Sequence, residues 1–125
     1  MAKGVQRLMK KQTVCITVNT QYEKIHRYDN APEAVRYLRY PHRHTFYVSV
    51  SIQVYSNDRE LEFILCKHNI DSFIANSKDE WAETSSCEMM ARYILNFLEK
   101  EYGEHRLYKV SVFEDNENGA TIEEG

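Results

Sequence analysis

The longest alternation of apolar and polar residues in the chain covers residues 42–54, HRHTFYVSVSIQV. Every second side chain from Phe46 to Val54 is apolar, and this pattern is typical of a β-strand with one buried face. The same face of the strand begins with His42 and His44. Histidines are uncommon on the buried face of a core strand. Residues elsewhere in the chain that could act together with these two imidazoles are therefore of interest.

Three segments around this strand carry weaker patterns. Residues 13–26 alternate in the same way, which predicts a first strand that ends near His26. Residues 29–41 contain two prolines and predict a loop that can include one helical turn after Pro32. After the long strand, the residues SNDR predict a tight hairpin turn, and the segment ELEFIL at 60–65 predicts a returning strand.

The C-terminal half predicts two helices. Apolar spacing predicts a short helix within 66–78, CKHNIDSFIANSK. A clearer helix is predicted within 85–103, where Ser85 and Glu88 fit a capping box and Gly103 is placed to end the helix. Its expected buried stripe is Met90, Ile94 and Leu98, with Met89, Tyr93 and Phe97 beside them.

A last strand is predicted at 107–115, LYKVSVFED, with Glu114 on the same face as Tyr108 and Val112. The residues NENG then turn the chain, and 120–125 are expected to form a short tail. The order of elements predicts an α+β protein, with two helices packed on one face of an antiparallel sheet.

The composition limits the class of protein. With 125 residues, 42% hydrophobic and 28% charged, the chain predicts one domain over 13–125 after a flexible basic N-terminal segment, 1–12. The net charge of −3 argues against nucleic acid as a partner. No apolar stretch approaches the ~18 residues of a membrane span, and the N-terminus lacks a signal-peptide pattern. Cysteines at 15, 66 and 87 show no disulfide or CxxC spacing, so we expect a cytoplasmic protein.

The two histidines of the long strand suggest a metal site. His42 and His44 project to one side, so both rings can reach one ion at the ~2.0–2.1 Å of Zn–N bonds. His26 is the natural third ligand if the first two strands pair antiparallel. Three neutral histidines with an open fourth position are typical of catalytic zinc. The alternative is a surface pair of histidines that binds no metal.

Several motifs resemble one known family. The segments IHRY, HRHTFYVSVSIQV, EFILCK, SSCE and VFED are similar, in order and spacing, to those of the 6-pyruvoyltetrahydropterin synthases, a family that includes the 6-carboxytetrahydropterin synthases of queuosine synthesis. The similarity runs from about residue 14 to the end. It implies the tunnelling fold, assembled as trimers stacked into a hexameric barrel, and a zinc-dependent lyase acting on a reduced pterin of the dihydroneopterin triphosphate type.

The resemblance also implies roles for particular residues. Zinc would be bound by His26, His42 and His44, and the Glu114 carboxylate would hold the guanidine-like edge of a pterin. The family's Pro-Thr-x-Glu motif is matched by Ser86 and Glu88, which would then contact the substrate, although Glu88 also suits a capping role.

The chain departs from the family where the proton-transfer groups should be. Leu38 stands at the position of the catalytic cysteine, and the shorter segment between the helices lacks the family's Asp-His pair. Arg43 replaces the glycine between the paired histidines, and its side chain is expected on the opposite face. Two weak replacements are Cys87, whose thiol pKa a helix N-terminus would lower, and Tyr40.

Two main hypotheses follow. The chain is either a zinc-dependent enzyme with an altered catalytic apparatus, or an inactive relative that binds a pterin, deazapurine or nucleotide as a sensor or sequestering protein. A third hypothesis is an oligomeric scaffold whose histidines bind no metal. In each, a homo-oligomer, trimer or hexamer, is expected from the resemblance.

Overall fold

The computed structural model describes residues 11–124, so residues 1–10 of the predicted basic segment 1–12 lie outside the described residues. Within the described range, the chain forms four strands, one 3-10 helix and two α-helices. In chain order they are β1 (Val14–His26), η1 (Glu33–Arg39), β2 (His42–Val54), α2 (Phe63–Ser77), α3 (Cys87–Tyr102), β3 (Tyr108–Glu114) and β4 (Asn118–Glu124). None of the described helices is long and apolar enough to cross a bilayer.

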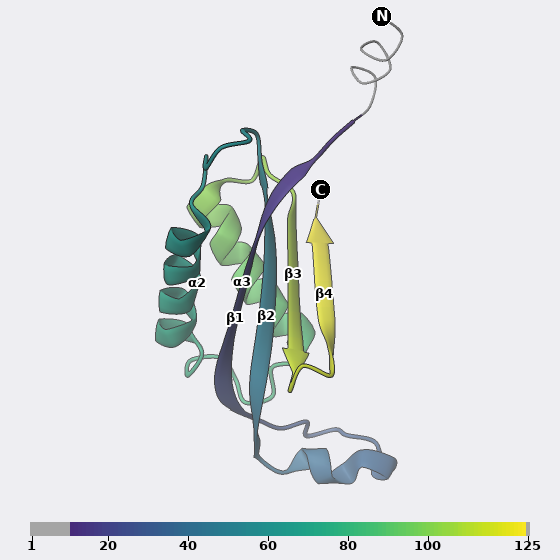
Figure 1. Ribbon diagram of the computed structural model, residues 1–125. Coiled ribbons are helices and arrows are strands. Elements are labelled where there is room, and N and C mark those ends of the chain that lie inside the picture. The colour runs from purple at the N-terminus through teal and green to yellow at the C-terminus, as the bar shows by residue number, and fades with distance from the viewer. Residues whose placement is uncertain (1–10, 125) are drawn as a thin grey trace, which may run out of the picture.

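The strands form one antiparallel sheet in the order β1-β2-β3-β4, and the α-helices cover one of its faces (Figure 1). Helix α2 packs against β1, whereas α3 packs against β3 and β4. This arrangement confirms the predicted α+β class. The core lies between the helices and the sheet, where Val50, Ile94 and Leu98 have no exposed surface.

The long strand occupies the predicted residues, 42–54, and pairs with β1 along its full length. The register runs from Val14 opposite Val54 to His26 opposite His42. In this register the apolar residues of β1 lie opposite the apolar residues of β2, on the face of the sheet that the helices cover. The histidines therefore continue the buried face of the sheet to its end.

The segment ELEFIL is not a strand, contrary to the prediction. Helix α2 begins at Phe63, because the Glu62 side chain accepts hydrogen bonds from the backbone N–H groups of Ile64 (2.9 Å) and Leu65 (3.1 Å). The buried residues Cys66, Ile70 and Ile74 recur every four positions and set the helix face. The turn at 56–59 therefore connects a strand to a helix, not two strands.

Helix α3 begins one residue later than the predicted capping box requires. The cap is Ser86, whose hydroxyl accepts a hydrogen bond from the Met89 N–H at 3.1 Å. Ser85 is buried, and its hydroxyl has no partner among the described residues. The predicted end of the helix is confirmed, since Gly103 adopts a φ of 104° and donates its N–H to the Glu99 carbonyl at 2.9 Å.

The expected C-terminal tail is a fourth strand, β4, which pairs with β3 from Asn118 opposite Glu114 to Glu124 opposite Tyr108. Ala120 and Ile122 pack against the core, so they alternate with the exposed residues of this strand. The β3–β4 turn contains Asp115 and Asn116 at φ 51° and 59°. Asp and Asn tolerate this left-handed conformation, which favours tight hairpin turns.

The loop between β1 and β2 contains η1, which starts after Pro32 as predicted but has seven residues and so exceeds the single helical turn expected there, and it lies beyond the end of the sheet (Figure 1). Two contacts fix it: the Tyr28 N–H donates to the Leu38 carbonyl at 2.7 Å, and the Arg39 guanidinium donates to the Ala31 carbonyl. The loop therefore returns the chain from His26 to His42 in a defined shape.

Candidate metal centre and ligand cavity

Four elements bring functional side chains to one end of the sheet. The ends of β1 and β3 meet the starts of β2 and α3 at the lower end of Figure 1. His26 lies opposite His42 in the β1–β2 register, and Glu114 of β3 lies opposite Phe46 of β2. The buried Phe46 ring forms a floor beneath the histidines, with its centroid 6.0 Å from the rings of both His26 and His44.

Each histidine uses one ring nitrogen for a hydrogen bond to the protein. The Nδ1 atoms of His42 and His44 lie 2.7 Å from the Tyr40 carbonyl oxygen and 2.6 Å from Asp115 Oδ2. Because a carbonyl and a carboxylate only accept, both Nδ1 atoms carry hydrogen. The His26 ring forms its hydrogen bond with the backbone of Ser85.

The second nitrogen of each ring is buried and has no hydrogen-bond partner among the described residues. These atoms are Nδ1 of His26 and Nε2 of His42 and His44. The potential ligand atoms of the three histidines lie within 4.8 Å of one another. Since an unsatisfied buried polar atom is costly, three that face one another indicate a shared ligand.

The chemistry of these donors fits a zinc ion. Zinc binds neutral imidazole nitrogens, and three such ligands leave a fourth position open. Burial lowers the pKa of His26, with smaller contributions from His42 and His44, against the opposing effect of Glu114. The His26 ring is therefore held in the neutral form that a metal requires.

Glu114 lies directly beside the histidines. Its carboxylate oxygens are 3.6 Å from His26 Nδ1 and 3.7 Å from His44 Nε2, which is longer than a hydrogen bond. The side chain is 30% exposed, so one side of the carboxylate faces the cluster while the rest remains accessible. This placement lets the carboxylate contact a molecule that approaches the cluster.

A cavity of about 540 Å³ adjoins the cluster, which is large enough for a bicyclic heterocycle. It brings together five residues singled out from the sequence: His26, Ser86, Cys87, Glu88 and Glu114. The sequence did not reveal the rest of the lining, which is Arg27, Tyr28, Thr84, Met89, Asn118 and Gly119. Arg27 and Tyr28 could have been found as neighbours of His26, but Asn118 and Gly119 were expected in a turn and instead begin strand β4.

The two weak catalytic candidates lie in different surroundings. Burial, followed by the charges of Glu114 and Glu88, raises the pKa of the Cys87 thiol to about 12, so the expected lowering by the helix N-terminus is wrong. Tyr40 is 71% exposed and lines a separate hollow formed by η1. The structure therefore places Cys87, but not Tyr40, in the cavity beside the histidines.

Two residues that were expected to depart from the motifs of the resembled family, Arg43 and Leu38, have clear positions. Arg43 points away from the histidines, as expected, and pairs with Glu23 at 3.6 Å on the exposed face. Leu38, which the resemblance was expected to place at the position of a catalytic cysteine, lies in η1 and contributes its carbonyl to the contact with Tyr28.

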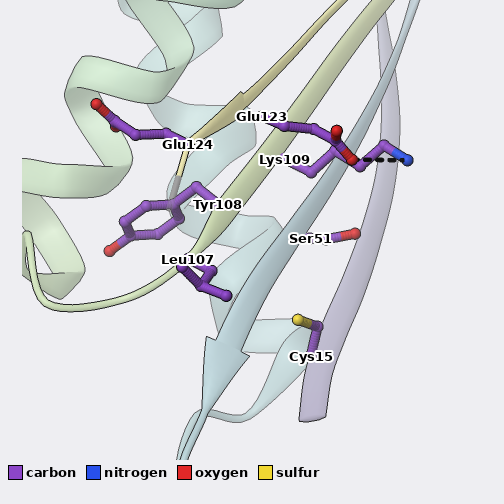
Figure 2. A pocket seen from close by; sticks show the side chains of 7 residues that line it. All are labelled: Cys15, Ser51, Leu107, Tyr108, Lys109, Glu123 and Glu124. Carbon is purple, nitrogen blue, oxygen red and sulfur yellow. Dashed lines mark ion pairs between the residues drawn. The ribbon is translucent and has the colours of Figure 1, made fainter. Parts of the chain in front are cut away.

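A second cavity, of about 460 Å³, lies at the opposite end of the sheet (Figure 2). Figure 2 shows Ser51, Lys109 and Glu123 on one side, with the Lys109–Glu123 ion pair of 3.5 Å drawn as a dashed line. Within the described residues, His26, His42 and His44 form the one group of three or more side chains placed to share a metal. The candidate metal site is therefore at the histidine end of the sheet, not beside the second cavity.

Comparison with known protein families gives a match. The family described as 6-pyruvoyl tetrahydropterin synthase matches residues 15–125. The chain therefore belongs to the 6-pyruvoyl tetrahydropterin synthase family. No curated protein gives a significant match to the chain.

Proposed function

We propose that the protein binds zinc through His26, His42 and His44 and holds a reduced pterin in the adjoining cavity. One observation carries this proposal: three buried ring nitrogens without partners face one another beside the Glu114 carboxylate. Family membership supports a pterin as the ligand. A bound zinc ion would supply Lewis-acid polarisation of a carbonyl or hydroxyl oxygen on the ligand.

Glu114 is proposed to anchor the ring of the pterin. Its two oxygens can accept two parallel N–H bonds from a guanidine-like edge, an arrangement that confers both strength and orientation. Ser86 and Glu88 line the same cavity from the start of α3. The Ser86 hydroxyl already accepts the Met89 N–H, and it can still donate its own hydrogen to a ligand.

The proposed catalytic cycle differs from the standard lyase reaction. A base at the position of Leu38 is absent, and the Cys87 thiol, with a pKa raised to about 12, is protonated at neutral pH. Cys87 is thus not available as a base at neutral pH. Because a positioned base contributes typically ~10²–10⁴ in rate, the protein is proposed to be a slow or altered enzyme. The alternative is a binding protein without turnover, for a pterin, deazapurine or nucleotide.

We further propose a homo-oligomer, a trimer or hexamer, as in the barrel of the tunnelling fold. Strands β1 and β4 are the edges of the sheet, so each can pair with another chain. The face away from the helices carries many neutral polar side chains at partly exposed or exposed positions, among them Thr17, Asn19, Ser49, Ser51 and Thr121. A barrel would enclose this face without burying unpaired charges.

The ligand proposal is tested by titrating zinc-loaded protein with 7,8-dihydroneopterin triphosphate in a calorimeter. We expect wild type to bind about one ligand per chain. Glu114→Gln should bind roughly 10–100-fold more weakly, since it loses a charge-assisted contact. Glu117→Gln, which changes an exposed glutamate of the same hairpin turn, is the matched control.

Unchanged binding by Glu114→Gln at equal zinc content would contradict the anchoring role. Release of triphosphate from the same ligand separates the two functions: slow release supports the enzyme, whereas binding without release supports the binding protein.

A further inference from the structure

The carboxylate of Asp115 lies against the outer side of the histidine cluster. Asp115 is the first residue of the β3–β4 turn, and its N–H donates to the Thr45 carbonyl at 2.7 Å. Its Oδ1 accepts the Thr45 N–H at 3.1 Å, and its Oδ2 lies 2.6 Å from His44 Nδ1. Two side-chain contacts and one backbone hydrogen bond to neighbouring residues of β2 therefore hold Asp115 in place, although its side chain is 45% exposed.

These contacts determine which nitrogen of His44 carries hydrogen. The Asp115 side chain is 45% exposed and accepts the Thr45 N–H, so at neutral pH it is an ordinary ionised carboxylate that can only accept a hydrogen bond from His44. The hydrogen of a neutral His44 ring must then be on Nδ1. Nε2, the buried atom that faces the other two histidines, is left with a free lone pair.

His44 differs in this respect from the other two rings. His42 is held by the Tyr40 carbonyl, and His26 by the backbone of Ser85, both of which are neutral groups. Only His44 of the three is held by an ionised side chain. An anionic acceptor behind an imidazole fixes the orientation of the ring and strengthens the opposite nitrogen as a ligand.

We propose that Asp115 is a positioning residue for the metal site: it holds His44 in the Nδ1–H form and makes Nε2 a stronger ligand for a divalent cation. The proposal rests on the proposed function only in taking zinc as that cation. Asp115 does not contact the space that the cation would occupy; it acts through His44.

The geometry of the turn allows a clean set of variants. Asp115 has a φ of 51°, which asparagine and glycine both tolerate, so neither substitution strains the backbone. Asp115→Asn keeps an oxygen that can accept the Nδ1–H but removes the charge. Asp115→Gly removes both the acceptor oxygen and the charge. Asn116→Gly, at a φ of 59° in the same turn, is the control for backbone effects.

The first measurement uses the metal-free protein, so it does not depend on zinc. Nitrogen NMR of ¹⁵N-histidine-labelled protein, at a pH where the rings are neutral, reports the tautomer of His44. We expect the Nδ1–H form in wild type, Asp115→Asn and Asn116→Gly, and a shift towards the Nε2–H form in Asp115→Gly. A wild-type tautomer in Asp115→Gly would overturn the proposal.

The second measurement is the zinc affinity, determined by competition with a chromophoric chelator. We expect Asp115→Gly to bind zinc about 10–100-fold more weakly than wild type, Asp115→Asn to be intermediate, and Asn116→Gly to match wild type. Equal affinity in wild type and Asp115→Gly would overturn the ligand-strengthening role. If wild type binds no zinc, the proposed function fails, and the tautomer measurement alone decides whether Asp115 positions His44.

Discussion

At the scale of the residue, the three histidines and Ser85 each have a buried polar atom without a hydrogen-bond partner among the described residues, but only the histidine atoms lie close together. His26, His42 and His44 each use one nitrogen for a protein acceptor and leave the other buried and facing its neighbours. The Ser85 hydroxyl is also buried without a partner, but it is one atom and not part of the metal-ligating group. The convergence of three such atoms, and not burial alone, is therefore what marks the histidines as a candidate metal site.

The residue scale also gives a prediction for the start of α3. Ser86→Ala should lower the free energy of unfolding of the metal-free protein by about 1 kcal/mol, because the Met89 N–H loses its acceptor. Ser85→Ala should leave it unchanged or raise it, because the hydroxyl it removes is buried and forms no hydrogen bond. Urea unfolding of both variants checks this, and the reverse order of effects would show that Ser85 is the cap.

The candidate site was only partly predictable from single residues. The alternating pattern placed His42 and His44 on one face, and antiparallel pairing brought His26 opposite His42. Asp115 could not be found in this way, because its contact with His44 depends on a left-handed turn and on the pairing of β2 with β3. The raised pKa of Cys87 was missed because burial and two nearby carboxylates outweigh the helix N-terminus.

At the scale of the element, a long apolar repeat predicted the secondary structure correctly, whereas the patterns of short segments did not. Strand β2 and helix α3 each carry a long apolar repeat, so the pattern alone specified them. The segment at 60–65 alternates for too few residues to specify a strand, and the Glu62 side chain starts a helix there instead. Strand β4 has only two core-facing apolar side chains, Ala120 and Ile122, and its pairing with β3 specifies it.

At the scale of the whole molecule, the candidate site lies at one end of the sheet, whereas the two edge strands, β1 and β4, run along its sides. The histidines, Glu114 and the cavity lie where β1 and β3 end, while β1 and β4 run along the two sides of the sheet. The family and the open edges both support assembly of several copies.

Sedimentation equilibrium of the full chain tests this assembly. We expect a mass of three or six chains, because pairing of β1 and β4 between copies satisfies both edges of the sheet. A monomer throughout the micromolar range, with zinc bound, would contradict the proposed barrel.

The central claim is that three histidines form a metal site, and the zinc content of the purified protein tests it most directly. Elemental analysis should find about one zinc ion per chain in wild type and none in His44→Ala. His68→Ala, which changes an exposed histidine of α2, is the matched control and should keep its zinc. Wild-type protein that contains no zinc after reconstitution at neutral pH, or His44→Ala that retains it, would contradict the account.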